Sequence, residues 1–186
     1  MITHNIIKNV AGNRIEYNQM VEPLPEQCFH LLEMNREEGI MKVILVSHGS
    51  FSKGLFETME MVLGEQQNLS YVGLYPHQGV DILKENIEKE FTKADEGEEI
   101  LVLTDLFYGS PFNAVVQLMN SYDVYHLTGI NVPLLMEILL MRGNGKSAAE
   151  ICDEAMKLAG STVQDVKKYL ADMLDNEEDE KCETSF

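Results

Sequence analysis

With 186 residues, of which 45% are apolar, the chain is long enough for one domain with a sizeable core. The formal net charge is −17 and no cluster of lysine and arginine offsets it, so the composition argues against a nucleic-acid partner. No apolar run approaches the roughly 20 residues of a membrane span, and no secretion signal starts the chain, which predicts a cytoplasmic protein.

Residues 1–40 do not share the regular pattern of the rest of the chain. They contain two prolines and only a weak apolar cluster, around residues 29–32. The codons of Arg36-Glu-Glu-Gly-Ile-Met41 can spell a purine-rich ribosome-binding site, which would make Met41 the true start. Two hypotheses therefore stay open for residues 1–40: a poorly ordered extension, and an untranslated leader with a wrongly assigned start.

From Met41 onward, strand-like and helix-like patterns alternate. In chain order, the apolar spacing predicts a strand at 42–47, a helix over 51–62, a strand at 69–75, a helix over 80–91 and a strand at 100–104. It then predicts a helix over 111–120, a strand at 124–128, and helices over 132–141, over 148–159 and from 163. This alternation predicts an α/β fold, with a mainly parallel sheet and helices on both faces.

Two segments of the second half carry further information. Residues 132–141 are apolar nearly all round, so this helix should be central in the fold or buried against another subunit. The last residues, 175–186, are strongly acidic, which is typical of a solvated, disordered tail. We therefore expect one folded domain over residues 41–174.

Two polar residues follow strands of the predicted sheet. His48 comes directly after the strand at 42–47 and Asp105 directly after the strand at 100–104. Each precedes a glycine-containing turn that leads into a helix. Because ligands of parallel α/β folds gather beyond the carboxyl ends of the strands, we expect His48 and Asp105 to meet there.

These residue types suit phosphoryl chemistry. A neutral imidazole is a nucleophile near physiological pH, and a carboxylate that accepts its ring N–H stabilises the cation formed during attack. Polar groups at helix starts bind anions. The phosphoryl-binding residues expected on this basis are Gly49, Ser50, Gly109 and Ser110. Each signal also has a structural reading, such as a helix cap at Asp105, so spacing alone leaves the reaction open.

Four segments of the chain resemble one protein family. They are Val43-Ile-Leu-Val-Ser-His-Gly-Ser50, Glu60-Met-Val-Leu-Gly64, Asp105-Leu-Phe-Tyr-Gly-Ser-Pro-Phe-Asn113 and Gly129-Ile-Asn-Val-Pro133. In this order they are similar to the mannose/fructose-type enzyme IIA domain of the bacterial phosphoenolpyruvate:sugar phosphotransferase system. The similarity covers nearly all of residues 41–174, and the segment that begins at Asp105 is the specific one.

The resemblance implies a phosphohistidine carrier. Phospho-HPr would donate a phosphoryl group to Nε2 of His48, and Asp105 would orient the imidazole. The group would pass to a sugar-specific enzyme IIB, and membrane permease subunits would couple the transfer to sugar uptake. The family has a mainly parallel sheet, forms homodimers that can exchange an edge strand, and needs no metal or other cofactor. The identity of the sugar resides mainly in the permease.

Tyr108 departs from the family pattern. The family usually has glycine at this place, in a Gly-Gly-Ser/Thr-Pro-Phe-Asn turn. If the turn needs a positive φ there, tyrosine adds strain; if it does not, the ring is free to line a docking face.

Three other functions fit part of the sequence. Leu45-Val-Ser-His-Gly-Ser50 also resembles the start of sirohydrochlorin-type chelatases, but the second histidine turn that those enzymes need downstream is missing. A related domain donates phosphoryl groups to dihydroxyacetone kinase, and a binding module that never takes phosphate is a third alternative. No spacing of His, Cys, Asp and Glu suggests a metal site, and none of the three cysteines is predicted to be catalytic.

Overall fold

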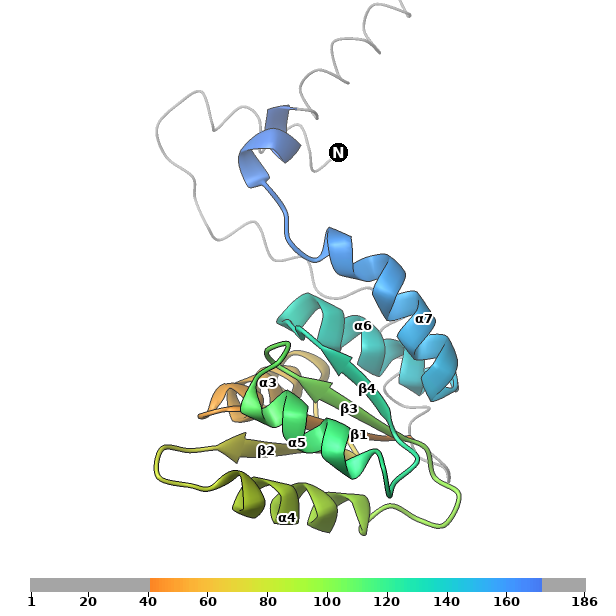
Figure 1. Cartoon of the computed structure of the whole chain (residues 1–186). Coiled ribbons are helices and arrows are strands. Elements are labelled where there is room, and N and C mark those ends of the chain that lie inside the picture. The colour runs from red at the N-terminus through yellow and green to blue at the C-terminus, as the bar shows by residue number, and fades with distance from the viewer. Residues whose placement is uncertain (1–40, 172–186) are drawn as a thin grey trace, which may run out of the picture.

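The structure is a computed structural model that describes residues 41–171, so the expectations for residues 1–40 and for the acidic tail at 175–186 lie outside it. Strands and helices alternate as the apolar spacing predicts (Figure 1). In chain order they are β1 (Lys42–His48), α3 (Phe51–Leu63), β2 (Leu69–Leu74), α4 (Val80–Phe91), β3 (Ile100–Thr104), α5 (Ser110–Leu118), β4 (Tyr125–Thr128), α6 (Val132–Gly143), α7 (Ala148–Leu158) and the short η2 (Ala159–Ser161). A further helical segment begins at residue 166.

The four strands form one sheet in which every neighbouring pair is parallel. The strand order is β2-β1-β3-β4, so β1 and β3 are central while β2 and β4 are edges. The central strands are buried along their whole length except at His48, the last residue of β1. This confirms the predicted α/β class, and it places the carboxyl ends of β1 and β3 side by side.

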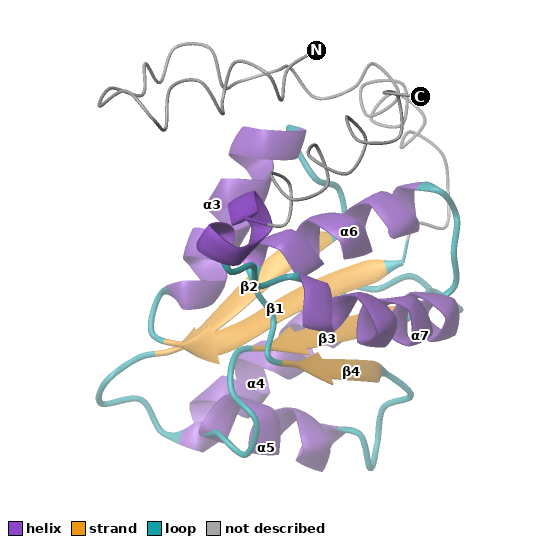
Figure 2. Cartoon of the chain, turned by 90° about the horizontal axis from the view of Figure 1, so that it is seen from above, coloured by secondary structure: helices purple, strands orange, loops and turns teal. Residues whose placement is uncertain are grey.

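Helices cover both faces of the sheet (Figure 2). α3, α6 and α7 lie on one face, and α4 and α5 lie on the other. Successive side chains of a strand point to opposite faces. Accordingly, Val43 and Leu45 of β1 enter the first core, while Ile44 and Val46 enter the second. The sheet therefore separates two apolar cores.

The apolar helix predicted over 132–141 is central. Leu134, Leu135 and Ile138 of α6 are buried in the core that α6 shares with α3 and α7. Because α6 packs on the sheet on one side and against α7 on another, apolar residues surround most of its circumference. Its burial against a second subunit stays a prediction. Within residues 41–171, no helix is both long enough and apolar enough to cross a membrane.

Several element ends differ from the sequence prediction by one to three residues, and two of the differences have identifiable reasons. β2 ends at Leu74, one residue early, because the N–H of Tyr75 donates to the side chain of Gln78. α6 continues past residue 141 to Gly143, although a cation ends the apolar run there. Arg142 is 5% exposed, and its guanidinium donates to a backbone carbonyl at the start of β1. Burial of this cation lengthens the helix, which apolar spacing does not predict.

Candidate functional site

His48 is the point at which β1 leaves the core. Ser47 before it is 1% exposed, whereas the side chain of His48 is 44% exposed. The backbone then turns at Gly49, whose φ of 55° is a left-handed conformation that glycine adopts without strain. α3 begins directly after Ser50, so the imidazole stands at the head of a helix.

His48 and Asp105 are in direct contact. Nδ1 of His48 lies 2.9 Å from Oδ2 of Asp105, and the backbone N–H of His48 donates to the same oxygen, also at 2.9 Å. The other carboxylate oxygen accepts the N–H of Leu106 at 2.8 Å. Because the carboxylate accepts the proton on Nδ1, the lone pair of the neutral imidazole is on Nε2.

The turn that follows Asp105 packs its backbone against the imidazole. A Cβ atom added at Gly109 would lie 2.7 Å from Cε1 and 3.4 Å from Nε2 of His48. Only a residue without a side chain can approach the ring this closely. The N–H of Gly109 donates to the carbonyl of Leu106 at 3.2 Å, and α5 begins at the next residue, Ser110. The site therefore combines one imidazole, one carboxylate and two helix starts.

Comparison with known proteins assigns a family to this arrangement. The family model described as "PTS system fructose IIA component" matches residues 42–156, a range that contains every residue of the site. The chain belongs to this family. Residues 42–156 are therefore a IIA domain of the phosphotransferase system (PTS), as the four motifs predict.

The IIA domain is similar to proteins from several bacteria. It is 30% identical over 126 residues to the "PTS system mannose-specific EIIAB component" of Escherichia coli (strain K12). That match covers 67% of this chain and 39% of the relative, so the chain spans well under half of that protein. It is 26% identical over 143 residues to the "PTS system fructose-specific EIIA component" of Bacillus subtilis (strain 168), covering 69% of this chain and 98% of the relative.

Solved structures share the fold of the IIA domain. The phosphotransferase system component EIIA from Streptococcus agalactiae matches with a TM-score of 0.63 at 27% identity, covering 69% of this chain and 98% of that one. The PTS IIA protein associated with the fucose utilization operon from Streptococcus pneumoniae matches with a TM-score of 0.59 at 29% identity, covering 70% and 96%. These matches confirm both the predicted family and the predicted fold class.

The backbone donors of the IIA domain differ in part from the sequence-based expectation. The N–H of Gly49 donates to the carbonyl of Leu74 at 2.8 Å, and the N–H of Gly109 is taken by its own turn. In this conformation both N–H groups donate within the chain, so contact of either glycine with a phosphoryl group stays a prediction. Ser50 and Ser110 stand at the starts of α3 and α5, where the first N–H groups have no acceptor within the helix.

Tyr108, which replaces the glycine usual in the family, has a φ of 60°. The turn therefore needs a positive φ here, and tyrosine is strained in it. The side chain is 73% exposed, and its ring lies 3.9 Å from that of Phe107 and 5.7 Å from that of Phe112, between centroids. The side chain of Asn113 donates to the carbonyl of Tyr108 at 3.3 Å. Of the two alternatives weighed from the sequence, the strained one therefore applies, and a role of the exposed ring in docking stays a prediction.

Burial shifts the pKa of other titratable side chains of the IIA domain, including His126 and Cys152. Nε2 of His126 on β4 lies 2.9 Å from Oγ1 of Thr104, and burial lowers the pKa of His126 to about 4. The imidazole of His126 is therefore neutral at physiological pH. Burial also raises the pKa of the Cys152 thiol, which makes it less reactive. Within residues 41–171, no group of three or more His, Cys, Asp and Glu side chains is placed to hold a metal ion.

Proposed function

We propose that this IIA component is a cytoplasmic phosphohistidine carrier of a sugar PTS. His48 accepts a phosphoryl group from phospho-HPr and passes it to a sugar-specific enzyme IIB, whose membrane permease subunits couple the transfer to sugar uptake. The observation that carries this proposal is the 2.9 Å contact between Nδ1 of His48 and Oδ2 of Asp105. It leaves Nε2 as the nucleophile at an exposed position beyond the carboxyl ends of the two central strands.

The proposed exchange conserves atoms and electrons. The lone pair on Nε2 of His48 attacks the phosphorus of the phosphohistidine on the donor. The phosphorus–nitrogen bond of the donor breaks, and its electron pair returns to the imidazole of the donor. His48 becomes a phosphorylated imidazolium that keeps its proton on Nδ1, where the negative charge of Asp105 stabilises it. Attack by the nucleophile of enzyme IIB on the same phosphorus reverses these steps and returns the electron pair to Nε2.

Groups around the imidazole have distinct roles in this proposal. Ser50 and Ser110, at two helix starts, bind the phosphoryl oxygens through their hydroxyls and the neighbouring first-turn N–H groups. Gly49 gives β1 its sharp exit, and Gly109 lets the second turn lie against the ring. Backbone and side-chain groups thus suffice for the exchange, and no cofactor enters the atom balance.

The test is phosphorylation by the donor system. Incubation with enzyme I, HPr and radiolabelled phosphoenolpyruvate should label the chain with one phosphoryl group that is labile in acid and stable in alkali. His48→Ala should abolish the label, while His77→Ala, in the loop after β2, should leave it unchanged. Stoichiometric label in His48→Ala would reject His48 as the acceptor, and no label in the natural chain would favour the binding module.

A second acceptor is compatible with the same chemistry at His48. A related domain donates to dihydroxyacetone kinase, and the identity of the acceptor lies outside the atoms of this site. Phosphorylated protein mixed with enzyme IIB or with dihydroxyacetone kinase separates the two, because only the true acceptor removes the label rapidly. The chelatase alternative gains no support, since within residues 41–171 no three or more His, Cys, Asp and Glu side chains are placed together to hold a metal ion.

We also propose that the chain forms a homodimer, for which two features of the described residues offer support. α6 is apolar nearly all round, with Val132 at its start 40% exposed. β4 leaves an edge of the sheet open to a further strand. Sedimentation at several protein concentrations tests the proposal, and a monomer at all of them would reject it.

A further inference from the structure

A groove runs along the open edge of β2, and the exchange at His48 does not use it. The groove has a volume of about 590 Å³ and lies between β2 and α4. Its lining includes Tyr71, Gly73, Tyr75, Asn86, Lys89 and Lys93. In Figure 1, α4 runs along the side of the sheet at which β2 forms the edge.

β2 presents backbone groups to this groove. The N–H and C=O groups of a strand point alternately to its two sides. The carbonyl of Leu74 accepts the N–H of Gly49 and so faces β1. Gly73 lies one position before Leu74 and Tyr71 three positions before it. Their backbone N–H and C=O groups therefore face the open side. Among the described residues β2 pairs with β1 alone, so these groups have no strand partner.

The groove closes where β2 ends. The N–H of Tyr75 donates to Oε1 of Gln78 at 3.0 Å, and the N–H of Gln78 donates back to the carbonyl of Tyr75 at 3.1 Å. This turn removes the next outward-facing N–H of the edge. Only a short extended segment can therefore pair with the edge, chiefly through Tyr71 and Gly73.

The edge is also in contact with the turn beside His48. A Cβ atom added at Gly73 would lie 2.4 Å from the carbonyl oxygen of Gly49, so no side chain fits there. A segment bound along β2 would therefore be separated from the backbone that positions His48 by one strand, and Gly73 of that strand contacts the turn after His48.

Two lysines give the groove a positive charge. Lys89 lies in the last turn of α4 and Lys93 two residues beyond its end, and both line the groove. Glu90 in the same lining is paired with Lys93 and also with Lys42, at 3.7 Å in the latter case. Two lysines and one glutamate therefore line the groove, and the nearly buried Lys42 also pairs with that glutamate, in a chain whose net charge is −17. Such a surface favours an anionic ligand.

We propose that this groove binds an extended polypeptide segment in which every second residue is Asp or Glu. The backbone of the segment pairs with Tyr71 and Gly73 as an added strand, and its carboxylates meet Lys89 and Lys93. This binding does not depend on phosphoryl transfer at His48.

A second copy of the chain fits this edge less well. Pairing β2 with β2 would bring the same lysines together, which is repulsive. β4, the other edge strand, has the sequence YHLT and brings no carboxylate. Lysines beside a sheet edge can instead prevent strand addition altogether. The experiment below separates that explanation from the proposal.

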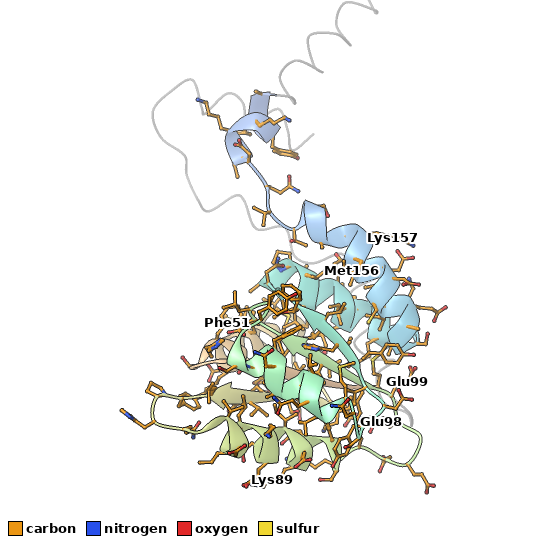
Figure 3. All side chains as sticks on the ribbon, in the orientation of Figure 1. Phe51, Lys89, Glu98, Glu99, Met156 and Lys157 are labelled. Atoms are coloured by element: carbon orange, nitrogen blue, oxygen red, sulfur yellow. The ribbon has the colours of Figure 1, made fainter. Side chains whose placement is uncertain are left out.

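The test uses the full chain and a synthetic peptide, acetyl-(Thr-Glu)₃-amide. Two-dimensional NMR titration should shift the amide signals of Tyr71, Gly73, Lys89 and Lys93. The double variant Lys89→Glu/Lys93→Glu should weaken binding by about tenfold or more. Lys157→Glu should leave it within about twofold. Lys157 is a matched control because it pairs with Glu154 at i,i+3, as Lys93 does with Glu90. Figure 3 shows Lys157 on α7, far along the molecule from Lys89 on α4.

A second pair of variants tests the backbone pairing between β2 and the peptide. Tyr71→Pro removes the outward-facing N–H without touching the ladder to β1, a change that an edge strand tolerates. It should weaken binding clearly more than Tyr71→Ala, which removes the ring but keeps the N–H. Peptides N-methylated on all Thr or on all Glu residues should differ, because only one set faces β2.

Three results would overturn the proposal. Equal binding of both methylated peptides would show a purely electrostatic contact. If millimolar peptide shifts no amide signal, the lysines serve only to prevent strand addition. Shifts at Tyr71 that depend on protein concentration rather than on peptide would assign the edge to a second copy.

Discussion

One carboxylate oxygen, Oδ2 of Asp105, lies 2.9 Å from both the backbone nitrogen and Nδ1 of His48. The two residues are 57 positions apart in the sequence and meet because β1 and β3 are adjacent parallel strands. A single oxygen thus holds the end of β1 and the ring that follows it. Anchoring the backbone and the imidazole through the same atom limits the directions in which Nε2 can point.

Asp105→Asn keeps the volume of this side chain and removes its charge. An amide can also present N–H₂ to Nδ1, which would favour the tautomer with its proton on Nε2. We expect phosphoryl transfer from phospho-HPr to slow by about 10²- to 10⁴-fold while the fold persists. Single-turnover quench-flow measures the rate, with Asp123→Asn, at an exposed position before β4, as control. An unchanged rate in Asp105→Asn would remove Asp105 from the mechanism.

Gly109→Ala tests the close approach of the second turn to the imidazole. The added Cβ would lie 2.7 Å from Cε1 of His48, so the ring or the turn must move. We expect transfer to fall by roughly tenfold or more, since misplacement of a reacting group by about 1 Å costs about 10²-fold. Gly160→Ala is the matched control, because a Cβ there meets nothing within 4 Å. Equal rates in the two variants would mean that contact with Gly109 does not position the ring.

The sequence predicts more of the scaffold than of the detail around His48. Apolar spacing predicts the alternating elements because β1 and β3 are continuous buried runs and each helix has apolar residues at helical spacing. Adjacency of His48 and Asp105 follows from the rule for carboxyl ends of parallel strands, once both are placed after central strands. Spacing does not show that the N–H groups of Gly49 and Gly109 donate to the carbonyls of Leu74 and Leu106. Those bonds depend on where neighbouring carbonyls lie in space.

The backbone conformation of Tyr108 predicts an unusual order of stability between two variants. A Cβ at a φ of 60° costs about 1–2 kcal/mol, which glycine avoids. The exposed ring contributes little burial in either case, since both variants remove it. We therefore expect Tyr108→Gly to be more stable than Tyr108→Ala by about 1 kcal/mol in urea unfolding.

An exposed helical residue supplies the control for this comparison. Met156 on α7 is 68% exposed and is labelled in Figure 3. There the order should reverse, with Met156→Ala more stable than Met156→Gly by about 1 kcal/mol. If the alanine variant is more stable than the glycine variant at both positions, the positive φ of Tyr108 stores no strain.

The buried histidine of β4 predicts a loss of stability in mild acid. Burial lowers the pKa of His126 from 6.5 to about 4, so between these values the unfolded chain binds a proton that the folded chain does not. Unfolding is therefore favoured as pH falls through about 6.5, and the loss stops growing near pH 4. Because the ring is partly exposed and water screens it, we expect His126 to contribute a loss on the order of 1 kcal/mol between pH 7 and pH 5. Urea unfolding of the natural chain and of His126→Gln isolates this contribution, since Gln does not titrate but can still hydrogen-bond Thr104. If the difference in free energy of unfolding between the two proteins is constant over this range, His126 is not the group that titrates.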